Sequence, residues 1–83
     1  MAEKHTIAVN VGGKGFTVIS DDPPAHVQQA ATLADRTLRE TARATRQSTR
    51  EAIPQALIAL ADQVIRLREE NVRLKDELQK VRK

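Results

Sequence analysis

The chain has 83 residues, a net charge of +3, no cysteine and a single aromatic residue, Phe16. The lack of cysteine excludes disulfides and thiolate metal sites, and a core of Val, Ile, Leu and Ala suits helix packing better than a globular enzyme core. A chain this short is one small domain at most, and such domains usually need a partner or a staple. No apolar run reaches the ~18–20 residues of a membrane span, and residues 1–5 carry no signal-peptide core, so we expect a cytoplasmic protein outside the membrane.

A β-hairpin is predicted over residues 6–19. Apolar residues alternate with polar or small ones on both sides of a glycine-rich segment: Ile7, Val9 and Val11 before it, Phe16 and Val18 after it. This period of two is typical of half-buried strands. The segment at residues 12–15 supplies glycines for a tight turn, since glycine takes positive φ without steric cost. It lacks the spacing and the following helix of a P-loop, so we predict no nucleotide site there.

A first helix is predicted over about residues 24–45. The segment at residues 20–24 is a helix-start signal, because an aspartate (Asp21 or Asp22) can cap free N–H groups and proline is tolerated in the first turn. The apolar residues that follow at helical spacing are Val27, Ala30, Ala34, Leu38 and Ala42. This alanine-rich stripe should pack closely on a neighbour, and we assign residues 1–48 to a small head built from the hairpin and this helix.

A long second helix is predicted over residues 49–83, with its start between residues 49 and 54. Ser48 and Glu51 fit a capping box that would open it, and Pro54, which lacks an N–H, either lies in the first turn or kinks the helix. From about residue 57 the chain carries four heptads of alternating three- and four-residue spacing, so we predict a coiled coil formed by a helix about 45 Å long. Its predicted oligomerisation positions are Leu57, Leu60, Val64, Leu67, Asn71, Leu74, Leu78 and Val81.

The coiled coil is predicted to be a parallel homodimer. Asn71 is the single polar residue of the seam, and a lone asparagine at such a position specifies register and favours two strands. In a parallel pair Glu70 faces Lys75 of the partner subunit, and Glu77 faces Arg82 of the partner subunit. Both pairs attract, which favours this orientation.

A second apolar stripe runs beside the seam. Its members are Ile58, Ile65 and Val72, which an isolated two-stranded coil would leave exposed. One interpretation is that Ile58 and Ile65 pack under the hairpin and the first helix. The other is that Ile65 and Val72 meet a second dimer, which makes a homotetramer our expected working form.

A series of arginines precedes the heptads. It consists of Arg36, Arg39, Arg43, Arg46 and Arg50, which would form one basic stripe on a continuous helix. Three interpretations stay open: a solvated face partly paired with Asp35 and Glu40, a contact for an acidic protein surface, or a nucleic-acid contact. A basic stripe before leucine heptads is the layout of a bZIP protein, but the capping box and Pro54 interrupt the continuous helix that a bZIP requires.

Catalytic and metal-binding constellations are not visible in the sequence. His5 and His26 have no partner residues at a suggestive spacing, and no nucleophile and base are arranged together. We therefore predict no enzyme activity, no metal site and no cofactor.

The order of these parts resembles the ZapA family of bacterial cell-division proteins. The residues that carry the resemblance are V-x-V-x-G-x-x-F at 9–16, D-D-P at 21–23, A-A-x-x-A-D at 30–35, the Ser/Thr-rich break at 45–49 and A-L-x-x-L-A-D-Q-V-x-x-L at 56–67. The resemblance implies a non-enzymatic protein with an α+β fold: a hairpin and short helix forming a small head, then a long coiled-coil helix.

The same resemblance implies a partner and a place of action. Proteins of this family bind FtsZ, the tubulin-like GTPase of the division ring at mid-cell, and cross-link its protofilaments, with heads that dimerise and dimers that join tail to tail. The implied FtsZ-binding residues here are Lys14, Arg43 and Arg46. The alternatives are a basic coiled-coil nucleic-acid-binding protein and a purely structural dimerisation module.

Overall fold

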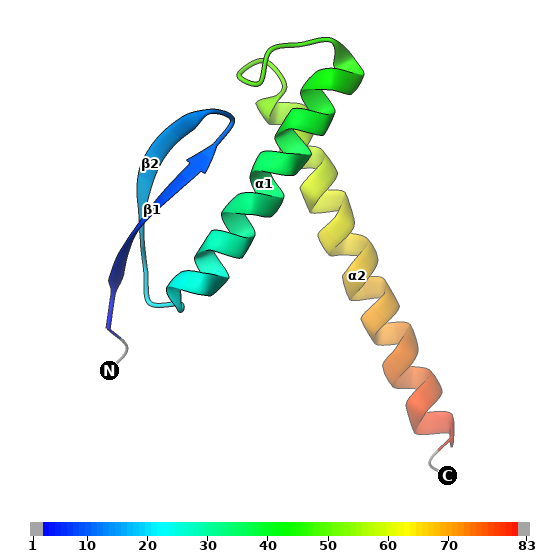
Figure 1. The fold of residues 1–83 in the computed structure, drawn as a ribbon. Helices are drawn as coiled ribbons and strands as arrows, with labels where there is room; N and C mark the ends of the chain where they lie inside the picture. The colour runs from blue at the N-terminus through cyan, green and yellow to red at the C-terminus, as the bar shows by residue number, and fades with distance from the viewer. Residues whose placement is uncertain (1–2, 82–83) are drawn as a thin grey trace.

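A hairpin followed by two helices makes up the fold in the computed structural model, which describes residues 3–81 (Figure 1). The elements are β1 (His5–Val11), β2 (Lys14–Ser20), α1 (Pro24–Thr45) and α2 (Ile53–Val81). The two helices meet at the connection between them and diverge like the arms of a Λ, with the hairpin beside α1 (Figure 1). The molecule is flat, measuring 52 × 41 × 15 Å. The α+β class and the order of hairpin, helix and long helix are as predicted.

The hairpin closes with a two-residue turn. Val11 pairs with Lys14, and only Gly12 and Gly13 lie between the strands, with φ of 65° and 82°. Positive φ at both central positions matches the twist of the flanking strands. The turn is thus shorter than the glycine-rich segment that predicted it, and Lys14 begins β2.

One face of the hairpin packs on α1. Ile7 and Val9 are buried there, while Ile19, on the opposite face, is exposed. Phe16 pairs with Val9 and shares the inner face, yet it remains 47% exposed because α1 packs mainly on β1. The alternation of apolar residues in the sequence therefore predicts correctly which face of the hairpin packs on α1.

The predicted aspartate cap of α1 is wrong. Pro23 takes the N-cap position and no side chain caps the helix. Pro23 and Pro24 hold the two aspartates too far upstream to reach the first-turn N–H groups. Asp22 instead donates its backbone N–H to Ser20 Oγ at 3.0 Å, and the Pro23 carbonyl accepts from Val27 at 3.2 Å.

The two helices pack through small residues. Leu38 and Ala42 of α1 form one buried cluster with Ala56 of α2 and Ala52 of the connection, and Val11 packs against it. Alanine side chains let the helix backbones approach closely. This core includes residues beyond position 48, so the start of the long helix is built into the same packed unit as the hairpin and α1.

The capping box at Ser48 is confirmed. Glu51 N–H donates to Ser48 Oγ at 3.1 Å, and Ser48 N–H donates to Glu51 Oε1 at 3.2 Å. Regular helix begins at Ile53, within the predicted range of residues 49–54 for its start. Pro54 has no N–H to give to the Arg50 carbonyl, which accepts a 3.4 Å bond from Ile53 instead. Pro54 therefore lies in the first turn.

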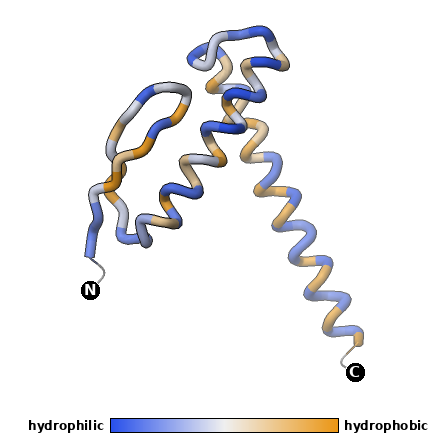
Figure 2. Tube along the Cα trace, viewed as in Figure 1, coloured by the Kyte–Doolittle hydropathy of each residue, from blue (hydrophilic) through white to orange (hydrophobic). Residues whose placement is uncertain are grey.

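Beyond Leu60, α2 has no packing partner among residues 3–81. Every residue from 61 to 81 is exposed, and leucine and valine alternate with charged residues along the helix (Figure 2). The chain exposes 7143 Å², against about 4,900 Å² expected for a folded monomer of 9.2 kDa. In the described part of the chain, neither helix combines the length and apolar character that crossing a membrane requires.

The second apolar stripe is exposed as well. Ile58 is 70% and Ile65 is 55% exposed, so the interpretation that they pack under the hairpin and α1 of their own chain is wrong. The physical reason differs for the two residues. Ile58 lies two residues after the buried Ala56, about 200° around α2 and thus on its outer side, and Ile65 lies in the exposed part of the helix beyond Leu60. Val72, further along, is also exposed.

Candidate functional site

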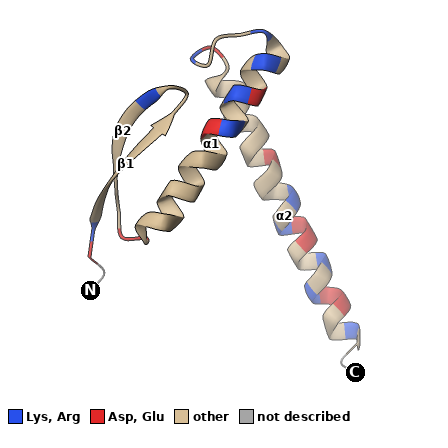
Figure 3. Cartoon of the chain, viewed as in Figure 1, with Lys and Arg blue, Asp and Glu red and all other residues tan. Residues whose placement is uncertain are grey.

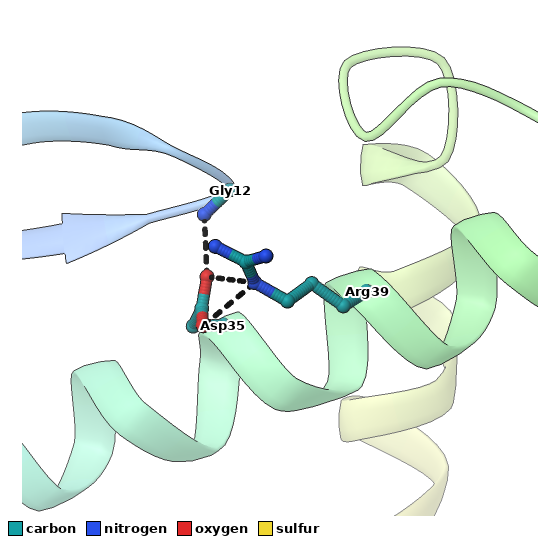
Figure 4. A network of polar contacts seen from close by, with 3 residues as sticks. All are labelled: Gly12, Asp35 and Arg39. Atoms are coloured by element: carbon teal, nitrogen blue, oxygen red, sulfur yellow. Dashed lines mark hydrogen bonds and ion pairs between the residues drawn. The ribbon is translucent and has the colours of Figure 1, made fainter.

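The hairpin turn is tied to α1 by one carboxylate. Gly12 N–H donates to Asp35 Oδ1 at 2.7 Å, and Arg39 Nε pairs with the same carboxylate at 3.0 Å (Figure 4). The Gly12 hydrogen bond, followed by Arg39, holds the pKa of Asp35 below its usual value. Asp35 is therefore an anion that fixes the turn and is already engaged on both sides.

Gly12 also sets how closely the turn approaches the helices. A Cβ at this position would lie 2.8 Å from Leu38 Cδ2 and 3.6 Å from Thr49 Cβ. Contacts under 3.0 Å force a neighbour to move, and the positive φ independently favours glycine. The turn therefore sits directly against α1 and the connection between the helices, and it carries Lys14 there.

Two grooves meet at Lys14. The first, which we call the basic groove, is about 360 Å³ and is lined by Lys14, Thr49 and Arg50 over the apolar side chains of Val11, Leu38 and Ile53. The second, which we call the apolar groove, is about 270 Å³ and extends past Phe16 to Leu57 and Leu60 of α2. Lys14 thus lies between the basic groove and the part of the apolar groove that leads to the first residues of the heptad seam.

Arg46 ends α1 in a strained conformation. Its φ of 55° and ψ of 39° are left-handed, and it is the one non-glycine residue with positive φ in the described chain. Gln47 N–H donates to the Ala42 carbonyl at 2.9 Å, as in a C-terminal cap where glycine is usual. An arginine here costs about 1–2 kcal/mol relative to a right-handed conformation.

The predicted arginine stripe is divided by the fold. Arg36, Arg39 and Arg43 lie on α1, whereas Arg46 ends the helix and Arg50 lies in the connection. The single continuous basic helix of a bZIP protein is therefore absent. The chain reversal instead brings Arg50 into the groove that Lys14 lines, while the two grooves at Lys14 include neither Arg43 nor Arg46.

Thr49 is a site residue that the sequence analysis did not select, and Arg50 was selected only as one member of the arginine series. The Ser48–Glu51 capping box could have indicated where Thr49 and Arg50 lie, because such a box places the two intervening residues in a tight turn. Which surface that turn would face was not visible in the sequence. It depends on the approach of Gly12 to Leu38 and Thr49.

Basic side chains near the groove have no acidic partner. Within residues 3–81 the ion pairs are Asp35–Arg39, Asp62–Arg66 and Glu70–Arg73. Positive residues gather on the turn, the end of α1 and the connection, whereas the distal part of α2 mixes both signs (Figure 3). Those without an ion pair in this described region include Lys14, Arg43, Arg46 and Arg50. No group of acidic or histidine side chains in the same range could hold a metal ion.

The predicted oligomerisation residues all lie on α2. Those beyond Leu60 project from the free part of the helix, where Asn71 is exposed. Glu70, predicted to face Lys75 of the partner subunit, pairs with Arg73 of its own helix at 2.7 Å. The second predicted charge pair includes Arg82, which lies outside the described residues.

Comparison with known proteins agrees with this architecture. Residues 7–83 match the family model described as "Cell division protein ZapA". A solved structure, described as a ZapA mutant dimer from Geobacillus stearothermophilus, is similar over 93% of this chain and 91% of that chain, with a TM-score of 0.66 and 24% identity. No curated protein matches the chain. The family match covers nearly the whole sequence and the solved structure has the same fold, and the chain accordingly belongs to the ZapA family of cell division proteins.

Proposed function

We propose that this protein is a non-enzymatic cross-linker that binds FtsZ and bundles its protofilaments at the mid-cell division ring. The observation that carries the proposal is the family match over residues 7–83. The unpaired basic residues on one end of the molecule support it, because they form a surface suited to an acidic protein. Lys14, Arg43 and Arg46 are the proposed FtsZ contacts.

Self-association is the second part of the proposal. The exposed heptad residues of α2 need a partner helix, and the similar Geobacillus protein is described as a dimer. Asn71 and the pairing of Glu70 with Lys75 of the partner subunit favour a parallel homodimer in register. Burial of Ile65 and Val72 between two dimers would then give a homotetramer.

The oligomer supplies the cross-linking activity. A weak contact between one head and one protofilament becomes effective when several heads are linked, because the later contacts form at high effective concentration. A tetramer with heads at both ends of the coiled coil could hold two protofilaments together. The function would then depend on α2 as much as on the basic surface.

Co-sedimentation with polymerised FtsZ tests the proposal. The wild-type protein should increase the pelleted fraction of FtsZ, and Lys14→Glu combined with Arg46→Glu should weaken this about tenfold or more, as expected when charges at a contact are reversed. The matched control is Arg66→Glu with Lys80→Glu, which makes the same charge change on the outer face of α2. It should pellet FtsZ like the wild type.

The same variants distinguish FtsZ binding from the two alternatives, nucleic-acid binding and a purely structural dimerisation module. Light scattering should show that the variants keep the wild-type mass, which removes oligomer loss as an explanation. Failure of the wild type to pellet FtsZ at moderate salt would refute the proposal. A shift of random duplex DNA with steep salt dependence would favour nucleic-acid binding instead, and negative results in both assays would leave a structural dimerisation module.

A further inference from the structure

We propose that the basic groove binds a single carboxylate side chain of the filament partner, held between Arg50 and Lys14. The inference rests on the proposed function and names the contact by which an FtsZ surface is recognised. It selects Arg50 from the arginine series, adds Thr49 to the interaction surface, and defines the chemical group that the surface binds.

The groove is formed by the fold and not by flexible side chains alone. Gly12 brings the hairpin turn against Leu38 and Thr49, and its hydrogen bond to Asp35 fixes that approach. The reciprocal bonds between Ser48 and Glu51 fix the tight turn that carries Thr49 and Arg50. The two cations are thus presented from two independently braced turns.

The carboxylates of the same region are already engaged. Asp35 accepts from Gly12 N–H and Arg39, and Glu51 accepts from Ser48 N–H. Neither forms an ion pair with Lys14 or Arg50 in residues 3–81. The groove therefore holds two positive charges without an internal counter-ion, which favours an anion from outside.

The shape of the groove favours an acidic side chain over a phosphate backbone. Its lining includes the apolar side chains of Val11, Leu38 and Ile53, which suit the methylene stem of an aspartate or glutamate. At about 360 Å³ it is a local recess, whereas a nucleic acid presents charges in a repeating row. The guanidinium of Arg50 can bind both oxygens of one carboxylate, and the Thr49 hydroxyl adds a further donor.

Substitution of Arg50 tests the inference in the same co-sedimentation assay. Arg50→Ala should weaken the pelleting of FtsZ about tenfold, which is typical of removing one partner of a charged contact. Arg50→Lys should retain part of the binding, and Arg50→Glu should weaken it more than Arg50→Ala. Arg36→Ala is the matched control, because Arg36 is an exposed arginine of α1 outside the basic groove.

The outcomes separate this inference from the proposed function. If the wild type pellets FtsZ and all three Arg50 variants do the same, the groove is not the contact, although FtsZ binding stands. If the wild type does not pellet FtsZ, both fail. Loss of duplex DNA binding in Arg50→Glu with normal FtsZ pelleting would overturn the inference in favour of a nucleic acid. Rescue of Arg50→Glu by an acid-to-lysine variant of FtsZ would support it and identify the carboxylate.

Discussion

The two halves of this molecule use similar apolar residues in opposite ways. In the packed region, residues 5–60, Leu38 is only 6% exposed and alanines close the gap between the helices. In the distal rod, residues 61–81, every side chain is exposed, including the leucines and valines of the heptads. The first region buries part of its apolar surface within one chain but leaves Leu57 and Ile58 exposed near its end, whereas every apolar side chain of the second region is exposed.

This difference separates two sources of stability. The packed region should unfold with a free energy that depends on its own contacts and on any contact between heads. The rod is a helix of about six turns in which every residue is exposed, and helices in proteins draw most of their stability from packing of an apolar face. Its helicity should therefore depend on protein concentration.

The largest expected effect comes from Leu67→Asp in the rod. Leu67 is 67% exposed in the single chain, so a charge there costs little in a monomer but would be buried in the coiled-coil seam. Light scattering across a concentration series should show a monomer, with reduced helicity by circular dichroism. Arg66→Asp, on the outer face, is the control and should keep the oligomer. An unchanged mass for Leu67→Asp at micromolar concentration would show that the seam is not the interface.

The next effect comes from Leu38→Ala in the packed region. Removing this buried side chain should lower the free energy of unfolding by about 2–5 kcal/mol, measured by urea denaturation. Ile19→Ala is the control, because Ile19 is 71% exposed and should cost less than about 1 kcal/mol. Equal losses for the two variants would mean that the hairpin's outer face is covered in the oligomer.

A smaller effect is expected from Arg46→Gly. Glycine adopts the left-handed conformation without strain, so the variant should gain up to about 1 kcal/mol in the free energy of unfolding. Arg43→Gly, inside the last turn of α1, should lose about 1 kcal/mol. If Arg46→Gly is more stable and also pellets FtsZ less well, the strained arginine is retained for binding and not for folding.

The smallest effect is the pH dependence contributed by Asp35. Its folded-state pKa is lowered from 3.8, first by Gly12 N–H and then by Arg39, so the carboxylate stabilises the fold above that value. This contribution is lost as the pH falls through the lowered folded-state pKa. The difference in urea midpoint between the wild type and Asp35→Asn should thus be larger at neutral pH than well below 3.8. A difference that does not change with pH would contradict this role.

Local patterns were sufficient to predict most of the secondary structure. The period of two around Gly12 and Gly13 predicted the hairpin and its inner face, and the heptads predicted a long helix whose apolar side needs a partner. The sequence also predicted the capping box formed by Ser48 and Glu51. These features depend on residues close together in the chain, where steric limits and hydrogen bonding act locally.

Two local inferences failed where two signals competed. An aspartate was expected to cap α1, but the two prolines that also mark the helix start occupy the cap and the first turn. One interpretation placed Ile58 and Ile65 under the hairpin, but Ile58 lies on the outer side of α2 and Ile65 lies beyond the packed region. Propensity identified the elements in both cases and did not determine their geometry.

What the sequence determined by itself is therefore the set of elements, their order and the need for a second chain. What only the tertiary structure decided is the composition of the basic groove. Lys14 and Arg50 are far apart in sequence, and they line one groove because Gly12 lacks a side chain and Asp35 holds the turn against α1. Contacts of this kind depend on the close packing of distant segments, which no local period records.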